Sequence, residues 1–270
     1  MNPFTVGLVQ FGVDRAKERN LEKIRNLMSG KRDAELIVLP EYVNFNLEHL
    51  SPEEAFQLAD SLDGAYMTSL QEMAKTHKVY LVGALLTKSP YPPKVYNTAF
   101  LIRPDGHLLA TYRKIHLYDA YHYKESEYVM PGNEKPRVID IGKTKVVLSI
   151  CFDLRFPELY RTAALEGAEL FLTPAAWYSG PMKEETLLTL ARARAIENTS
   201  YMVMASQFSK VFTGRSAVVD PYGTVMMDMG AGEKYGEITL DLNVVRESRT
   251  IIPTLTLRRP EVYFSRNGGA

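Results

Sequence analysis

The sequence predicts an α/β protein built as a four-layer αββα sandwich of two mixed sheets with internal pseudo-twofold symmetry. Short apolar runs alternate with segments of helical spacing along both halves, as in α/β proteins. The segment DAELIVLPE, residues 33–41, also lines up with GAELFLTPA, residues 167–175. Each half carries a proline-glycine turn, at residues 103–106 and 220–223. Two sheets covered by helices on one face would bury their bare faces against each other.

In the first half, each element follows from its local pattern. Continuous apolar runs bounded by polar or turn residues predict buried strands, and apolar residues three and four apart predict helices. The expected order is a strand at 5–10, a helix at 16–28, a strand at 36–39, a helix at 53–77, a strand at 79–85 and a hairpin at 97–114.

The second half repeats this order. The expected elements are a strand at 146–150, a helix at 158–166, a strand at 170–173, a helix at 184–197, a strand at 201–205 and a hairpin at 214–229. No Ser/Gly-rich linker or low-complexity tract divides the chain. We therefore expect one domain over residues 1–270, with 244–270 as a C-terminal tail.

Composition and charge argue against a nucleic-acid-binding or membrane protein. The chain is 46% apolar and 24% charged, which is ordinary for a globular protein, and its 32 basic residues balance 32 acidic ones. No net field draws it to nucleic acid or to an anionic membrane, so we expect neither partner. The sequence has no apolar run of membrane-spanning length, and its first residues do not resemble a signal peptide, so we expect a cytoplasmic protein.

The single cysteine, Cys151, ends an apolar run and precedes an expected helix. It cannot form an intrachain disulfide or a multi-cysteine zinc site. A strand-to-helix turn exposes a side chain and points backbone N–H groups toward it, which suits a nucleophile and its oxyanion. A buried, inert thiol is the alternative. A Cys–His pair with His116 is a second one.

Two charged residues also follow buried strands. Glu41 comes after Pro40 at the end of the strand at 36–39, where α/β sheets place their pockets. Burial there would raise the pKa of its carboxyl and make it a usable general base. Lys114 ends the second strand of the hairpin. With Cys151 they put a base, a cation and a thiol at the ends of three strands.

Three motifs resemble the nitrilase superfamily of carbon–nitrogen hydrolases in order and spacing, and the resemblance covers nearly the whole chain. They are Leu39-Pro40-Glu41-Tyr42, Tyr112-Arg113-Lys114-Ile115-His116-Leu117 and Cys151-Phe152-Asp153-Leu154-Arg155-Phe156-Pro157-Glu158. The pattern is most similar to the branch that includes omega-amidases and deaminated-glutathione amidases. In that branch the substrates are small amides that carry a carboxylate.

The resemblance implies a role for each motif residue. Glu41 is the general base, Lys114 stabilises the tetrahedral intermediate, and Cys151 is the nucleophile. Glu125 corresponds to a second glutamate that helps to place the substrate, and the backbone N–H of Phe152 contributes to the oxyanion hole. The implied reaction passes through a Cys thioester and releases ammonia and a carboxylic acid. It needs no cofactor and no metal, and the family's homo-oligomers suggest a homodimer or larger assembly with tail contacts between subunits.

The substrate stays open at this point. Arg155 could anchor a substrate carboxylate or form an ion pair with Asp153 or Glu158. Aromatic residues that follow strand ends or lie in the tyrosine-rich segment are expected to border the pocket: Phe45, Tyr121, Trp177 and Tyr178. After Ser179-Gly180-Pro181 the chain departs from the branch pattern, so nitriles and N-carbamoyl amines remain alternatives to amides. A catalytically silent binding or scaffold protein with the same fold is another.

Overall fold

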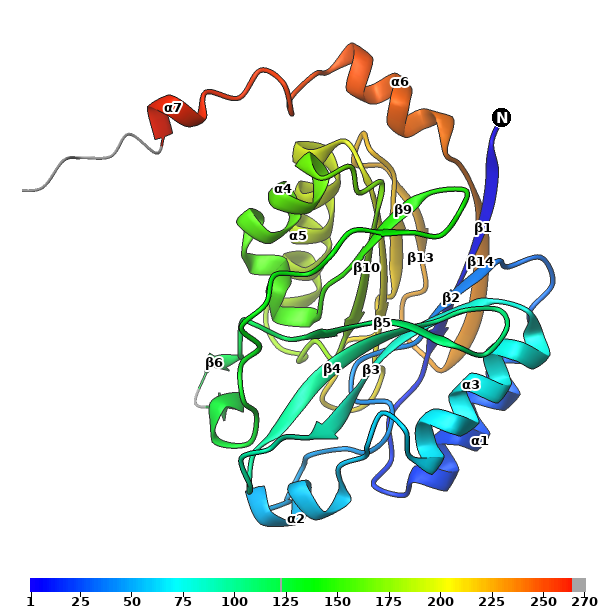
Figure 1. Ribbon diagram of the computed structural model, residues 1–270, viewed down its shortest axis with the longest axis vertical. Coiled ribbons are helices and arrows are strands. Elements are labelled where there is room, and N and C mark those ends of the chain that lie inside the picture. The colour runs from blue at the N-terminus through cyan, green and yellow to red at the C-terminus, as the bar shows by residue number, and fades with distance from the viewer. Residues whose placement is uncertain (122, 264–270) are drawn as a thin grey trace, which may run out of the picture.

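Two six-stranded sheets stack face to face in the computed structural model, which describes residues 1–121 and 123–263 (Figure 1). The first sheet has the order β14-β1-β2-β3-β4-β5 and the second β13-β12-β11-β10-β9-β8. The first contains β1 (Pro3–Gln10), β2 (Leu36–Val38), β3 (Tyr80–Lys88), β4 (Val95–Ile102), β5 (Leu108–Arg113) and β14 (Lys234–Asp241). The second contains β8 (Ile139–Asp140), β9 (Lys145–Leu148), β10 (Leu170–Ala175), β11 (Tyr201–Ser206), β12 (Ala217–Val219) and β13 (Val225–Asp228).

Helices cover the outer face of each sheet (Figure 1). On the first sheet lie α1 (Lys17–Met28) and α3 (Ala65–His77), and on the second lie α4 (Pro157–Leu165) and α5 (Lys183–Asn198). The remaining elements are α2 (Pro52–Leu58), the hairpin β6 (Asp119–Ala120) with β7 (Tyr123–Lys124), the 3-10 turns η1 (Glu125–Glu127) and η2 (Cys151–Arg155), α6 (Asn243–Ile251) and α7 (Pro260–Tyr263). The predicted αββα sandwich is confirmed.

The internal symmetry extends to the pairing of the strands. In the first sheet β1, β2 and β3 are parallel and continue into the antiparallel hairpin of β4 and β5. In the second sheet β9, β10 and β11 are parallel and continue into β12 and β13 in the same way. An antiparallel outer strand completes each sheet, β14 beside β1 and β8 beside β9. The repeated segments at 33–41 and 167–175 therefore contain the equivalent strands β2 and β10.

The central strands are buried on both faces. In β1 the side chains of Phe4, Val6 and Leu8 pack in the core between the sheets, whereas Val9 packs beneath α1 and α3. On the other side, Tyr160 of α4 packs edge-on against Phe171 of β10 with ring centroids 5.1 Å apart. Because strands covered on both sides are apolar at consecutive positions, these segments read as continuous apolar runs in the sequence.

Two expectations about elements are wrong. The helix expected at 53–77 is divided into α2 and α3, because Asp60 leaves the helix and pairs with Thr87 beside β3. Its carboxylate accepts hydrogen bonds from Lys17 Nζ and Asn44 Nδ2, each at 2.7 Å, which holds the chain extended there. The strand β14 is not among the predicted elements, because its residues are only partly buried and show no continuous apolar run.

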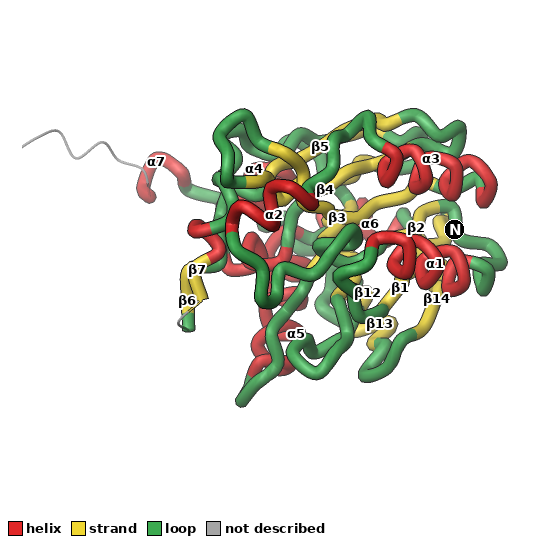
Figure 2. The backbone as a smooth tube through the Cα atoms, turned by 90° about the horizontal axis from the view of Figure 1, so that it is seen from below, coloured by secondary structure: helices red, strands yellow, loops and turns green. Residues whose placement is uncertain are grey.

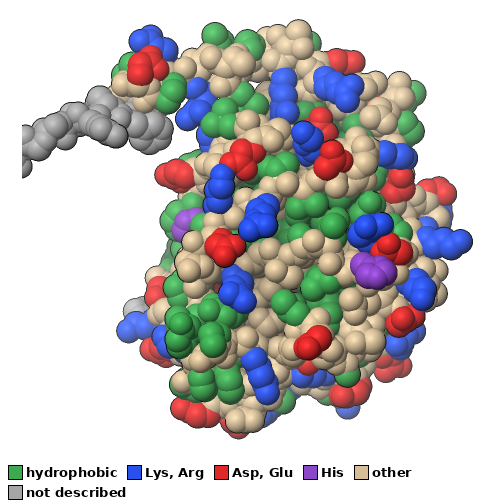
Figure 3. Space-filling view, viewed as in Figure 1, with side chains coloured by type: hydrophobic (Ala, Val, Ile, Leu, Met, Phe, Trp, Pro, Cys, Tyr) green, Lys and Arg blue, Asp and Glu red, His purple; other side chains and the backbone are tan. Residues whose placement is uncertain are grey.

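The C-terminal segment leaves the body of the molecule beyond α6 (Figure 1). It carries exposed apolar side chains, including Ile252, Leu257 and Val262. Residues 264–270 of the expected tail lie outside the described residues. On the face in Figure 3, basic and acidic side chains are interspersed. Across residues 1–121 and 123–263, no helix combines the length and apolar character needed to cross a membrane.

Candidate active site

The pocket lies where the carboxyl ends of strands from both sheets meet. Glu41 follows β2, Lys114 follows β5 and Cys151 follows β9. Backbone contacts join the two sheets here, since the N–H of Glu41 donates to the carbonyl of Ala175 at 3.2 Å. The side chain of Gln207, after β11, donates to the Glu41 carbonyl at 2.8 Å. The pseudo-symmetric packing of the sheets thus brings together three residues that are far apart in the sequence.

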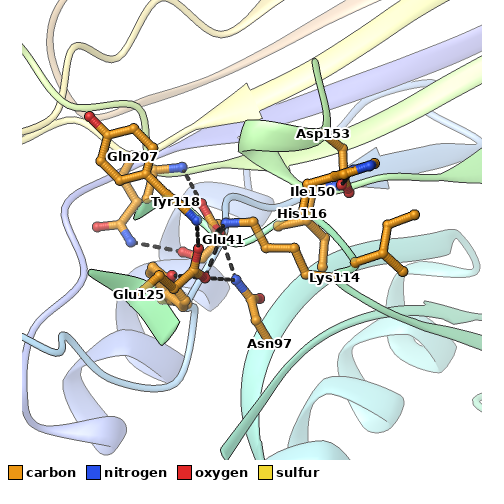
Figure 4. Close-up of polar contacts among 12 residues, drawn as sticks. Glu41, Asn97, Lys114, His116, Tyr118, Glu125, Ile150, Asp153 and Gln207 are labelled. Carbon is orange, nitrogen blue, oxygen red and sulfur yellow. Dashed lines mark hydrogen bonds and ion pairs between the residues drawn. The ribbon is translucent and has the colours of Figure 1, made fainter. Parts of the chain in front are cut away.

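Lys114 is buried between two carboxylates (Figure 4). Its Nζ lies 3.1 Å from Glu41 Oε1 and 2.8 Å from Glu125 Oε2, and its side chain is 1% exposed. Glu41 and Glu125 are equally buried. Two carboxylates and one ammonium leave this cluster with one negative charge if all three are ionised. Such a group is stable in a protein interior only when its oxygens are hydrogen-bonded.

Further donors hold both carboxylates in place. Ala176 N–H donates to Glu41 Oε2 at 2.8 Å, and Tyr118 N–H donates to Glu125 Oε2 at 2.6 Å. Tyr42 Oη donates to Glu125 Oε1 at 2.8 Å. Tyr42 stands next to Glu41 in the motif, but the sequence alone gives no sign of this contact with Glu125. These contacts fix the carboxyl groups before any substrate arrives, which is what electrostatic preorganisation requires.

Cys151 occupies a strained turn. It is the first residue of η2 and has φ of 43°, a left-handed conformation that is uncommon and costs energy for a non-glycine residue. The first N–H groups of a helical turn have no acceptor within that turn, so the N–H of Phe152 is available to a ligand. Asp153 supports the turn by accepting hydrogen bonds from the Ile150 N–H at 2.8 Å and from Tyr112 Oη at 2.9 Å.

His116 belongs to this support. Its Nδ1 lies 2.7 Å from Asp153 Oδ1, and its ring stacks on Phe156 with centroids 3.7 Å apart. In Figure 4 it lies with Asp153 and Ile150, to one side of the buried carboxylates. No hydrogen bond joins it to Cys151 among the described side chains. The contacts of His116 therefore indicate a structural role and do not form the alternative Cys–His pair.

Burial determines the proton affinities of the site. It raises the pKa of the Cys151 thiol well above its ordinary value, and the neighbouring Glu41 carboxylate raises it further. Burial likewise raises the pKa of Glu41, against the opposing effect of Lys114. For Lys114 burial alone would lower the pKa, but Glu125 and Glu41 outweigh it and keep the ammonium charged. The thiol is thus neutral at rest, and a carboxylate with raised pKa stands ready to take its proton.

A cavity of about 400 Å³, its open mouth included, contains these groups. It is lined by Glu41, Tyr42, Lys114, Tyr118, Tyr123, Cys151, Ala176, Trp177, Tyr178 and Lys183. Trp177 and Tyr178 border it as expected from the sequence. The guanidinium of Arg155 lies 5.2 Å from the Trp177 ring and makes no ion pair with Asp153 or Glu158. Lys183, the first residue of α5, also lines this cavity, although it was not among the predicted pocket residues.

Two predicted pocket residues lie elsewhere. Phe45 is fully buried in a separate apolar cluster with Leu50 and Ala55, because the chain after Val43 turns beneath α2. Tyr121 is 72% exposed on the hairpin of β6 and β7, which projects from the body in Figure 2. Its ring does not line the cavity but lies 3.6 Å from Lys183 Nζ. Within residues 1–121 and 123–263, no three His, Cys, Asp or Glu side chains are grouped to hold a metal ion.

Comparison with known proteins identifies relatives along nearly the whole chain. Residues 5–250 match the family model "Carbon-nitrogen hydrolase". Deaminated glutathione amidase of Escherichia coli O157:H7 is 34% identical over 93% of this chain and 95% of its own length. Omega-amidase NIT2 of Mus musculus is 34% identical over 97% of this chain and 98% of its own.

Solved structures of related enzymes have the same fold as this chain. Nit3 of Saccharomyces cerevisiae, described as a member of the nitrilase superfamily, superposes with a TM-score of 0.83 at 31% identity, covering 95% of this chain and 97% of that one. An amidase from Nesterenkonia sp. AN1 superposes with a TM-score of 0.83 at 26% identity, covering 97% and 96%. That structure is of the E41Q mutant of the amidase, and in it the acetamide moiety of fluoroacetamide is covalently attached to the active-site cysteine.

Proposed function

This chain belongs to the carbon–nitrogen hydrolase family, and we propose that it hydrolyses small amides through a thioester on Cys151, releasing ammonia and a carboxylic acid. The observation that carries the proposal is the burial of a thiol, a carboxylate and an ammonium around one cavity. Each of the three has a separate task in amide hydrolysis: attack, proton transfer and stabilisation of the oxyanion.

In the acylation half-reaction, Glu41 takes the proton of the Cys151 thiol, and the sulfur attacks the amide carbon. The electron pair of the carbonyl moves to oxygen, and this oxyanion faces the Lys114 ammonium and the N–H of Phe152. Glu41 then gives its proton to the nitrogen, the carbon–nitrogen bond breaks, and ammonia leaves. The raised pKa of Glu41 suits a group that serves first as base and then as acid.

In the deacylation half-reaction, Glu41 takes a proton from a water molecule while the water oxygen attacks the thioester carbon. The second oxyanion occupies the same position as the first. When the carbon–sulfur bond breaks, the proton returns from Glu41 to the sulfur and the carboxylic acid leaves. Glu125 holds Lys114 throughout, since its two oxygens lie 3.1 and 2.8 Å from Nζ. The covalent adduct in the Nesterenkonia amidase supports attack by sulfur in a relative.

The test of this proposal is ammonia release from a panel of ω-amides of dicarboxylates, neutral amides, N-carbamoyl amines and nitriles. We expect release from the amides, with the carboxylic acid as co-product in mass spectra. Turnover confined to nitriles or N-carbamoyl amines would replace the amide proposal by one of those alternatives, because the same three groups can serve all of these substrates. An inactive protein whose Cys151 resists electrophiles would indicate a binding or scaffold protein instead.

Two cations favour amides whose acyl group carries a carboxylate. Lys183 lines the cavity, and Arg155 lies near two lining residues, Tyr118 and Trp177. Neither cation has an acidic partner among the described residues. Unpaired cations at a pocket attract an anionic substrate, and guanidinium binds carboxylate with two parallel hydrogen bonds. We therefore propose that these two residues hold the far carboxylate of the substrate.

Arg155→Met and Lys183→Met are each expected to lower kcat/KM for a five-carbon dicarboxylate ω-amide about tenfold or more, because a charge-assisted hydrogen bond is lost. The values for pentanamide, which lacks the carboxylate, should change less than about threefold. Steady-state kinetics on both substrates measures the difference. Lys143→Met, which removes a surface lysine paired with Glu35, is the matched control. Equal losses on the two substrates would contradict a role in carboxylate binding.

We also propose a homodimer in which the segment after α6 contacts a second copy. Leu257 and Val262 are 72% and 56% exposed on a segment that leaves the body of the molecule, and such apolar side chains are usual at interfaces. A nucleophilic thiol must also stay reduced, which agrees with the expected cytoplasmic location.

Sedimentation of the protein is expected to give a dimer, and the double variant Leu257→Asp with Val262→Asp should sediment as a monomer, because charges cannot be buried unpaired in an apolar interface. Tyr91→Asp, at an exposed apolar position outside this segment, should leave the assembly unchanged. A monomeric parent protein would refute the proposal.

A further inference from the structure

Asn97 lies in β4, buried beside both glutamates of the site, and nothing in its local sequence marks it as functional. Its Nδ2 donates to Glu41 Oε1 at 2.7 Å and to Glu125 Oε1 at 3.2 Å. We propose that Asn97 is a positioning residue that holds Glu41 and Glu125 through one amide group and thereby lets Glu41 act as the base. This inference rests on the proposed function, because it concerns the same proton transfer.

The two hydrogen bonds of Asn97 complete a closed arrangement (Figure 4). Glu41 Oε1 and Glu125 Oε1 each accept from Asn97 Nδ2, and each also lies 3.1 Å from Lys114 Nζ. Two donors therefore alternate with two acceptor oxygens around a ring. One donor is charged and the other is neutral. A second cation in place of Asn97 would cancel the negative charge that Glu41 needs as a base. A hydroxyl side chain has one O–H and could donate to only one of the two glutamates, whereas the amide has two N–H donors.

The other end of the same amide strengthens the inference. Asn97 Oδ1 is buried and has no hydrogen-bond partner among the described residues. A buried acceptor without a partner costs stability, and such groups call for an explanation. Turning the amide over would place Oδ1 against two carboxylate oxygens, which is worse. The surroundings therefore favour the amide orientation in which Nδ2 donates to both glutamates, although Oδ1 has no partner among the described residues.

The hydrogen bond from Asn97 acts on the proton affinity of Glu41. Burial raises the pKa of Glu41 most, Lys114 lowers it, Glu125 raises it, and the Asn97 donor lowers it. Removing this donor must therefore raise the pKa of Glu41 further. A base works only when ionised, so the acid limb of the pH–activity profile should move to higher pH in its absence. The groups that face Glu41 in this balance are Lys114, Glu125, Cys151, Tyr42, Tyr178, Asn97 and the N–H of Ala176.

The experiment compares pH profiles of kcat/KM for the wild type, Asn97→Leu and Asn97→Asp. Asn97→Leu keeps the shape and removes both donors, and we expect its acid limb to move upward by about one pH unit. Asn97→Asp adds a third carboxylate and should move the limb further in the same direction. A loss of activity that is equal at all pH values, with the limb unmoved in both variants, would overturn the proposal. Because Asp is nearly isosteric with Asn, it serves if the Leu variant fails to fold.

Asn198, the last residue of α5, offers a matched control. It is also fully buried, its Nδ2 donates to the carbonyl of Arg194 at 2.9 Å, and its Oδ1 is likewise without a partner. Asn198→Leu removes the same atoms from the same kind of environment away from the glutamates. We expect lower stability and an unmoved acid limb. If the acid limb moved equally in both leucine variants, the shift would be a consequence of lower stability in general, and the role of Asn97 would be overturned.

A second readout separates this inference from the proposed function. The rate at which 2-iodoethanol, an electrophile without an amide group, alkylates Cys151, followed by mass spectrometry against pH, reports proton removal from the thiol without any substrate. We expect the same upward movement for Asn97→Leu in this rate. If Cys151→Ala retained full amidase activity, the proposed function would fail. If the thiol mechanism held and the alkylation profile of Asn97→Leu matched that of the wild type, the inference about Asn97 alone would fail.

Discussion

Cys151→Ala is expected to lower kcat for the best amide on the order of 10⁴-fold or more, because no other group can form the covalent intermediate. Cys151 is the single cysteine of the chain, so no neighbouring thiol can substitute for it. The variant should still fold, since alanine removes only one sulfur from a position where the side chain is 7% exposed. Ammonia release and the circular dichroism spectrum together measure both effects.

The proposed thioester on Cys151 can be tested directly. Rapid quenching of the wild type during turnover should give a mass increase that matches the acyl group, and digestion should locate it on the peptide that contains Cys151. Treatment with fluoroacetamide should add one acetamide group per chain and abolish activity in parallel. Ser206→Ala, which removes a buried hydroxyl near the end of β11, is a control that should keep the acyl adduct. An active Cys151→Ala enzyme would refute the thioester mechanism.

Lys114→Met is expected to be the most destabilising single change at the site, by about 3–5 kcal/mol, because it leaves two buried carboxylates without their cation. Its activity should fall by about 10²- to 10³-fold as well, since the developing oxyanion loses a charged partner. Urea unfolding measures the first effect, and steady-state kinetics on the remaining folded protein measures the second.

The stability of Lys114→Met should depend on pH in a defined direction. Burial already raises the pKa of Glu41 in the folded state, and replacing Lys114 removes the largest effect that opposes this rise. A group whose pKa is raised by folding stabilises the folded form at low pH and loses this contribution as pH rises. The midpoint of urea unfolding should therefore increase from neutral pH toward pH 5. Lys143→Met, which breaks an exposed pair, should change stability by less than about 1 kcal/mol, with no such trend.

Much of the fold is determined by local sequence. The repeated segments at 33–41 and 167–175 mark β2 and β10, which are equivalent strands of the two sheets. Continuous apolar runs located the central strands, because those strands are buried on both faces. The turn at Cys151 was also recognisable, because an apolar run ends at this residue and a helix begins a few residues later, at Pro157.

Other features depend on contacts between distant parts of the chain. The break between α2 and α3 results from the contacts of Asp60 with Lys17 and Asn44, which no local pattern contains. Phe45 and Trp177 both follow buried strands, yet one packs in an apolar cluster and the other lines the cavity. The spacing of apolar residues predicts which face of a helix or strand is buried, but it does not predict which other residues that face contacts.

The sequence by itself determined the αββα class, the internal repeat and the motif residues Glu41, Lys114 and Cys151, because those depend on periodicity and on short motifs read along the chain. Only the tertiary structure decided that Asn97 bonds both glutamates, that Arg155 has no acidic partner within the described part of the chain and that Lys183 reaches the cavity. The physical reason is that hydrogen bonds and ion pairs act over a few ångströms in space. Residues that meet at such distances here are often separated by dozens of positions in the chain.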